Sequence, residues 1–135
     1  MVSLPRLQAF ARGENEDDAV RLMRRLGRGL AALTAGETMT NIEALVQSAA
    51  IQRGLDDFEW LEDGAVLRRH GYLFDVASDG GRVVLRAWPW SHGRTGRAAF
   101  VARGDELLRH ENRDARWSGR ERPPSSGDGG WTAVH

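Results

Sequence analysis

Side chains suited to ligand binding gather in one stretch of the chain, AWPWSHGRTGR at residues 87–97, and in the arginine just before it. Tryptophan faces stack on sugars or bases, and arginine side chains bind phosphate or carboxylate groups. From this chemistry we expect ligand or partner contacts at Arg86, Trp88, Trp90, His92, Arg94 and Arg97. The same stretch also fits a connection between two strands, with Gly93 and Gly96 supplying unusual backbone angles and the tryptophans serving as core. We favour the connection, and the ligand site stays open.

Other constellations that carry chemistry lack their defining spacing. His70, His92 and His110 do not show the HxxxH or HExxH spacing of zinc sites. The acidic stretch DDFEWLEDG at 56–64 offers oxygen ligands that suit calcium, but not in the spacing of an EF-hand loop. There is no cysteine and no GxSxG motif. We therefore predict a non-enzymatic protein with no catalytic residue, no cofactor and no metal ligand, and we interpret 56–64 as a solvated acidic turn.

Composition predicts one globular domain without a membrane-spanning segment. The chain has 135 residues, of which 41% are hydrophobic and 28% are charged, and these values are typical of a single folded domain. Its longest stretch without a charge, residues 44–52, is much shorter than the roughly 18 apolar residues of a spanning helix. The chain does not begin with a secretory signal pattern. We therefore expect a cytoplasmic protein with no membrane insertion.

Charge is balanced overall but uneven along the chain. The 19 basic residues are all arginine and equal the acidic residues in number, which argues against a general nucleic-acid binder. Residues 1–81 carry 9 arginines and 13 acidic residues, whereas residues 82–122 carry 10 arginines and 5 acidic residues. The second region can therefore attract anions, or the acidic region of a neighbouring copy.

Two helices are predicted before any regular strand pattern. Across 15–33, with Asn15 as the N-cap, apolar residues recur every three or four positions. Gly27 and Gly29 inside this helix indicate a kink or a close packing point. A second helix that begins with a capping box is expected over 41–53. The apolar face of the first helix comprises Ala19, Leu22, Met23, Leu26, Leu30 and Leu33.

After Gly54 the apolar spacing changes from helical to alternating, and the alternation predicts four strands. These are GYLFDVA (71–77), RVVLRAW (82–88), RAAFVAR (97–103) and ELLRH (106–110). With the helices, they predict an α+β domain over 15–111, in which two N-terminal helices pack on one face of a four-stranded antiparallel meander. Residues 1–14 are expected to be a flexible N-terminus. Residues 112–135, rich in Pro, Gly and Ser, are expected to form an extended C-terminal arm anchored by Trp117 and Trp131.

Short motifs within the predicted strands resemble the head domains of type IV pilin-like proteins, in particular the pseudopilins of type II secretion. They are Gly71, Tyr72, Phe74 and Val76, then Ala87 and Pro89, then Thr95, Gly96, Arg97 and Phe100, and finally Gly104, Leu107 and Arg109. The resemblance spans about residues 15–117 and implies a long helix against an antiparallel sheet of three or four strands. The pilin leader and its apolar membrane helix have no counterpart here. The resemblance therefore implies a soluble, bacterial pilin-like domain.

Two hypotheses for function follow. The first is a structural or protein-interaction domain, with a protein partner or self-association in which the arginine-rich end of the sheet meets the acidic start of the helix of another copy. The second is a small binding module for an anionic ligand, nucleic acid or acidic glycan, through the loop 86–97.

Overall fold

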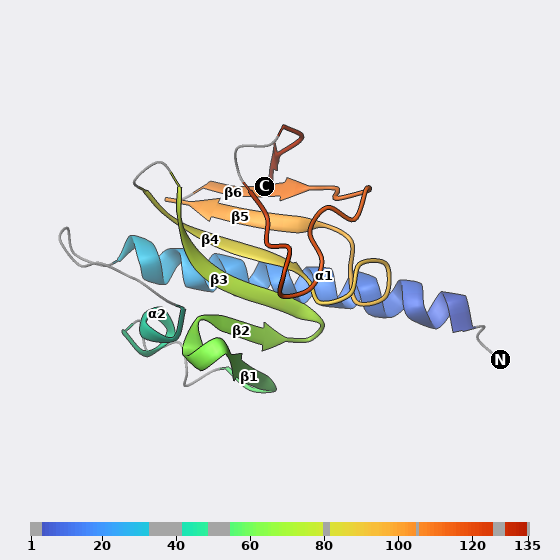
Figure 1. Cartoon of the computed structure of the whole chain (residues 1–135), viewed down its shortest axis with the longest axis horizontal. Helices are drawn as coiled ribbons and strands as arrows, with labels where there is room; N and C mark the ends of the chain where they lie inside the picture. Colours follow the sequence, from blue (N-terminus) through green and yellow to red (C-terminus); the bar gives the residue numbers. More distant parts are fainter. Residues whose placement is uncertain are drawn as a thin grey trace.

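The computed structural model describes residues 4–32, 42–48, 55–79, 82–104, 106–125 and 129–134. Strands in these ranges form one seven-stranded antiparallel sheet whose spatial order is the order of the sequence (Figure 1). One edge of the sheet therefore comes from an earlier region of the chain, and the opposite edge comes from a later region. The strands are β1 (Phe58–Leu61), β2 (Val66–Arg69), β3 (Tyr72–Asp79), β4 (Arg82–Pro89), β5 (Ala99–Arg103), β6 (Glu106–His110) and β7 (Thr132–Ala133).

The longest strand pair, β3 and β4, defines the two faces of the sheet. Successive side chains point to opposite faces of a strand, so Tyr72 joins one apolar cluster and Leu73 joins the other. The register places Leu73 opposite Trp88 and Asp75 opposite Arg86. Opposite charges facing each other across two strands stabilise that register.

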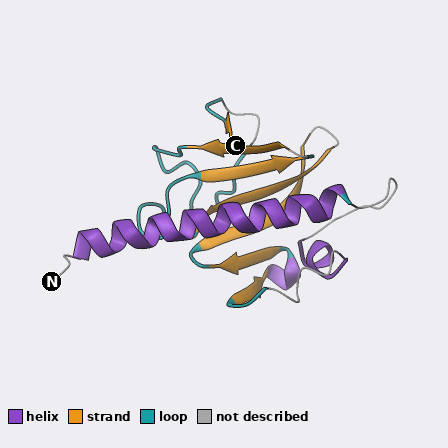
Figure 2. Ribbon diagram, turned by 180° about the vertical axis from the view of Figure 1, so that it is seen from behind, coloured by secondary structure: helices purple, strands orange, loops and turns teal. Residues whose placement is uncertain are grey.

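Helix α1 (Leu4–Ala31) runs across one of these faces (Figure 2). The apolar stripe in its second half is almost fully buried, at Ala19, Leu22, Met23 and Leu26. Gly27 faces β5 but is not needed for a close approach, because a Cβ atom on it would make an ordinary van der Waals contact, 4.0 Å from the Cβ of Ala102. The short helix α2 (Ile42–Ser48) adds Ile42, Leu45 and Val46 to the same core.

The first part of α1 extends past the end of the sheet (Figures 1 and 2). We call residues 4–11 the overhang. Proline is tolerated in the first turn of a helix, so Pro5 does not prevent a start at Leu4. Every side chain of the overhang that the structure describes is exposed. The overhang therefore gains little from the core, and its surface faces outward.

The opposite face of the sheet is covered by residues 112–125, which we call the arm (orange to red in Figure 1). Trp117 of the arm is only 5% exposed and stacks on Trp131, with ring centroids 5.3 Å apart. Both tryptophans belong to the cluster that contains Leu73 and Trp88. The sheet therefore lies between a helix and an irregular arm.

The α+β class and the antiparallel sheet are as predicted, but the layout of two N-terminal helices on a four-stranded meander is wrong. The sequence pattern misses β1, β2 and β7, because strands of two to four residues are too short to show a clear alternation. One long helix covers the sheet, and it begins at Leu4 instead of Asn15. Asn15 lies inside it and bonds a loop instead of capping the helix. The predicted helical positions 33, 41 and 49–53 lie outside the described residues.

Candidate interaction surface

Just after the overhang, α1 holds the loop 91–97 through three side chains. The guanidinium of Arg12 donates to the carbonyl of Gly93 at 2.8 Å, and the side-chain amide of Asn15 donates to the carbonyl of Thr95 at 2.9 Å. The Oε1 atom of Glu16 accepts from the backbone N–H groups of Arg97 and Ala98, at 2.9 and 3.2 Å. The loop therefore lies against the helix at the base of the overhang.

Two glycines allow this loop to pack closely on β3. A Cβ atom at Gly96 would overlap the ring of Tyr72. Gly71 has a φ of 77°, and a Cβ atom there would come within 2.7 Å of the Cβ of Thr95. The hydroxyl of Tyr72 donates to the carbonyl of Ala98 at 2.7 Å, and burial raises the pKa of Tyr72 well above its usual value. These contacts give the loop a defined shape.

The first two of the six predicted contact residues, Arg86 and Trp88, have structural partners. The Nε atom of Arg86 donates to the carboxylate of Asp75 at 2.8 Å, and its Nη1 atom donates to the carbonyl of Pro124 in the arm at 2.9 Å. Trp88 is 1% exposed, and its indole N–H donates to the carbonyl of Gly119 at 2.7 Å. Both residues attach the arm to the sheet, and Trp88 offers no stacking face to a ligand.

Trp90 and His92 are half-buried and also have partners. The guanidinium of Arg68 lies over the ring of Trp90, 4.2 Å from its centroid, which is the geometry of a cation–π contact. The Nε2 atom of His92 lies 2.6 Å from the backbone oxygen of Asn112, and the hydroxyl of Ser118 accepts from its backbone N–H. His92 therefore joins the loop to the arm.

The remaining two predicted contact residues, Arg94 and Arg97, are exposed at the loop. Within the described ranges, neither guanidinium has a hydrogen-bond or ion-pair partner. Arg113, at the start of the arm, is exposed and unpaired in the same sense. Of the six residues chosen from the sequence, two are therefore available to another molecule.

Among the described residues, the exposed large hydrophobic side chains lie on the overhang, and they were not predicted from the sequence. Leu7 is 51% exposed and Phe10 is 69% exposed. Residues three apart in a helix lie on the same side of it, so these two side chains form one small apolar surface. The signal in the sequence was the spacing of Leu4, Leu7 and Phe10, which continues the helical periodicity towards the N-terminus.

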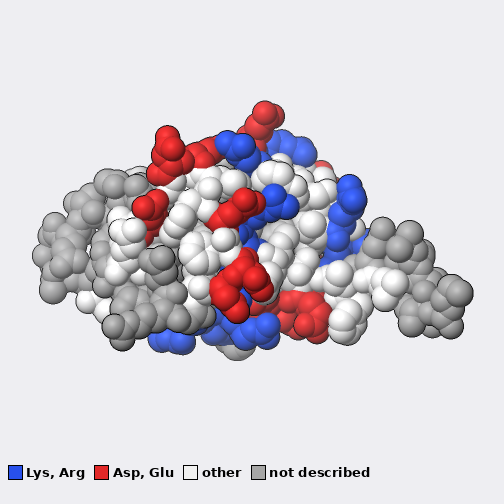
Figure 3. Space-filling model, turned by 90° about the horizontal axis from the view of Figure 1, so that it is seen from below, with Lys and Arg blue, Asp and Glu red and all other residues white. Residues whose placement is uncertain are grey.

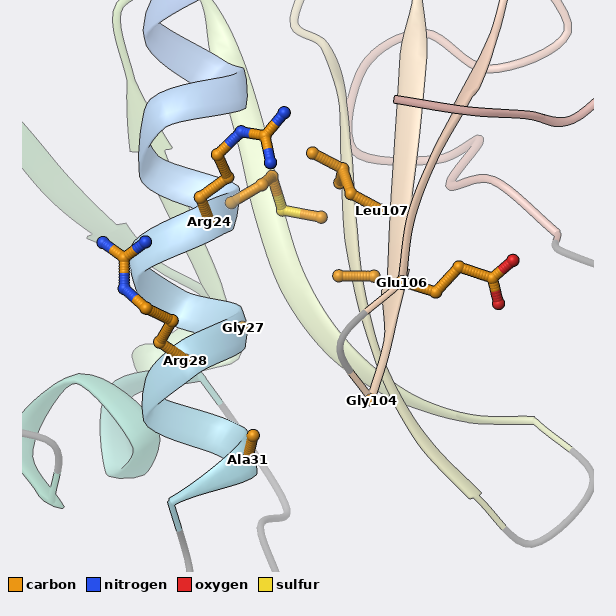
Figure 4. A pocket seen from close by; sticks show the side chains of 9 residues that line it. Arg24, Gly27, Arg28, Ala31, Gly104, Glu106 and Leu107 are labelled. Carbon is orange, nitrogen blue, oxygen red and sulfur yellow. The ribbon is translucent and has the colours of Figure 1, made fainter. Parts of the chain in front are cut away.

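A cleft of about 170 Å³ lies between α1 and the β5–β6 hairpin (Figure 4). Met23, Gly27 and Leu107 line it, while Arg28 and Glu106 point away from its interior. The lining includes no histidine, serine or threonine. Across the part of the chain that the structure describes, no three histidine or acidic side chains cluster to hold a metal ion, and no helix is long and apolar enough to cross a membrane.

Because the strands are arranged in sequence order, the more acidic and the more basic regions of the sequence lie in different parts of the sheet. Asp56, Asp57 and Glu59 lie at β1, at one edge of the sheet, with side chains that are 81%, 79% and 56% exposed. Seen from that edge, acidic side chains gather near the middle of the surface, with arginine side chains between them (Figure 3). The exposed arginines 94, 97 and 113 belong to the later part of the chain, at the loop and the arm.

Comparison with known proteins gives no relative for this surface. No protein-family model, curated protein or solved structure matches the chain. The resemblance to pilin-like heads therefore stays a prediction. The exposed residues at the base and tip of the overhang are the features from which a function can be inferred.

Proposed function

We propose that this chain is a non-enzymatic protein-interaction domain that associates with another copy of itself through the overhang of α1. The observation that carries the proposal is the exposure of Leu7 and Phe10 on one side of the part of α1 that extends beyond the sheet. Complete burial of a Leu or Phe side chain contributes about 1.5–3 kcal/mol. More than half of each surface is still available, so a contact that covers both residues would stabilise association.

Two further features support self-association. The chain has no net charge, yet it exposes acidic side chains at the β1 edge and arginines at the loop 91–97, so one copy can pair with the next through opposite charges. The resemblance to pilin-like structural domains, which implies a long helix on an antiparallel sheet, belongs to the same proposal. The alternative, stacking of nucleic acid or glycan on the loop, is less well supported because Trp88 is buried and Arg68 lies over Trp90.

The test replaces both apolar side chains of the overhang. We expect light scattering after size-exclusion chromatography to show a mass that rises with concentration for the native chain. Leu7→Ser with Phe10→Ser should remain monomeric, with an unchanged circular dichroism spectrum, because neither side chain belongs to the core. Ala9→Ser, also on the exposed overhang, is the matched control and should associate like the native chain. A native chain that stays monomeric when concentrated would contradict the proposal.

A further inference from the structure

We propose that the overhang of one copy docks on the β1 edge of a second copy, where exposed acidic residues adjoin two half-buried aromatic rings. This inference rests on the proposed function and adds the surface that receives the overhang. We call Asp56, Asp57 and Glu59 the acidic edge, and Arg94, Arg97 and Arg113 the basic loop end.

The basic loop end lies beside the overhang, and hydrogen bonds hold the two in a fixed arrangement. Arg12, one residue past the overhang, bonds the loop at Gly93. The side-chain amide of Asn112 donates to the carbonyl of Arg97 at 2.8 Å, which places the adjacent Arg113 next to the loop. Within the described ranges, none of the three arginines of the basic loop end has an ionic partner. The overhang therefore presents an apolar surface with unneutralised positive charge at its base.

The acidic edge offers the complementary chemistry. Its carboxylates pair with arginines of β2 that already have other contacts: Arg69, 3.1 Å from Asp56, also contacts Asp18 at 2.8 Å, and Arg68, 3.2 Å from Glu59, lies over a tryptophan ring. Among the described residues, the carboxylate of Asp57 pairs only with the imidazole of His70, at 3.8 Å. Exposed pairs of this kind are weak. Negative charge at this edge is therefore only partly neutralised.

Aromatic rings next to these carboxylates provide an apolar contact. Phe58 and Trp60 of β1 pack edge to face with ring centroids 5.3 Å apart, and both are half-buried. A docked overhang can place Leu7 and Phe10 near these rings while the basic loop end faces the acidic edge. Leu7 and Phe10 are not covered by their own chain. The proposed contact with Phe58 and Trp60 is therefore one between two copies.

Charge reversal on each surface tests the pairing. The loop variant carries Arg94→Glu with Arg97→Glu, and the edge variant carries Asp56→Arg with Glu59→Arg. In each variant alone, the reversed surface of one copy meets a surface of the same charge on the next copy, so association should weaken at least about tenfold. An equimolar mixture of the two variants restores opposite charges at the contact, so light scattering should again show a mass above that of the monomer. A variant with Arg28→Glu and Arg82→Glu, an equal change of charge at two exposed positions outside both surfaces, is the matched control.

The outcomes separate this inference from the proposed function. Rescue in the mixture, with each variant alone monomeric, supports docking on the acidic edge and also shows that both variants fold. If Leu7→Ser with Phe10→Ser abolishes association while the edge variant associates normally, the docking inference is overturned and the proposed function stands. If the native chain is monomeric but sediments with vesicles of anionic phospholipid through Arg94 and Arg97, the surface binds lipid and both are overturned.

Discussion

Helix α1 covers one face of the sheet with a continuous apolar stripe, whereas the arm covers the other with Trp117, which stacks on Trp131, and with a set of hydrogen bonds. On the helix side, Leu22, Met23 and Leu26 are buried against strands by apolar contact alone. On the arm side, Trp88 and Arg86 donate to arm carbonyls. The comparison shows that an irregular segment, which has no periodic apolar face, is held in place through its backbone groups.

This difference predicts different responses to loss of a core side chain, which is the largest effect we expect. Phe100→Ala, on the helix side, should lower the free energy of unfolding by about 3–5 kcal/mol. Trp117→Ala, on the arm side, should lower it less, because the arm can open while the helix and sheet remain folded. Hydrogen exchange resolved by residue would show rapid exchange in the arm and intact protection in α1. Equal loss of protection in both regions would contradict a separable arm.

Asn112 sharpens the comparison, because it joins the arm to the loop with hydrogen bonds. It is 1% exposed, and its side chain donates to the carbonyls of Arg97 and Trp117 and accepts from the N–H of Trp117. Asn112→Ala should cost about 1–3 kcal/mol of stability, because these partners lose their bonds in a buried place. Asn112→Gly loses the same bonds but tolerates the positive φ of 54°. If denaturant unfolding shows the glycine variant to be as stable as the native chain, the side-chain bonds contribute little.

Tyr72 places a fully buried titratable group among the apolar residues of the helix side. Burial raises its pKa, with the carboxylate of Glu16 adding to the rise and Arg109 opposing it. A tyrosine in the unfolded chain ionises near pH 10, whereas the folded chain keeps Tyr72 protonated. The contribution of Tyr72 to the free energy of unfolding is therefore fully present below about pH 10. Above that pH the free energy of unfolding falls by at most about 1.4 kcal/mol per pH unit because of this residue.

The measurement is unfolding by denaturant as a function of pH. Tyr72 is the only tyrosine, so phenolate absorbance reports on it directly. Tyr72→Phe should lack this residue's contribution to the loss of stability at high pH. Phenolate absorbance that develops near pH 10, while circular dichroism still shows a folded chain, would be inconsistent with the buried geometry.

The extent to which the fold could be predicted followed the length of each pattern. Ala19, Leu22 and Leu26 repeat often enough to identify the helix face, and Tyr72 to Val76 alternate long enough to identify β3. The four residues of β1 and the two of β7 are too short for a period. The helix start was misplaced because an asparagine before three acidic residues resembles an N-cap.

The site was harder to predict because its residues were chosen by chemical type, and their partners are distant in the sequence. His92 meets Asn112, and Arg86 meets Pro124, through contacts 20 and 38 residues apart that no local pattern reveals. The exposure of Leu7 and Phe10 depends on where the sheet ends, which is a property of the folded chain. Sequence therefore identified residues with suitable chemistry, and the fold determined which of them are available.

Hydrogen exchange of the overhang at increasing protein concentration tests the central claim most directly, namely that the overhang is an interface between copies. We expect amides within residues 7–11 to become more protected as concentration rises, while amides of the exposed end of the arm near Arg122 stay unchanged. A sample that light scattering shows to be associated, yet whose overhang amides exchange at the same rate as in the dilute chain, would contradict the account.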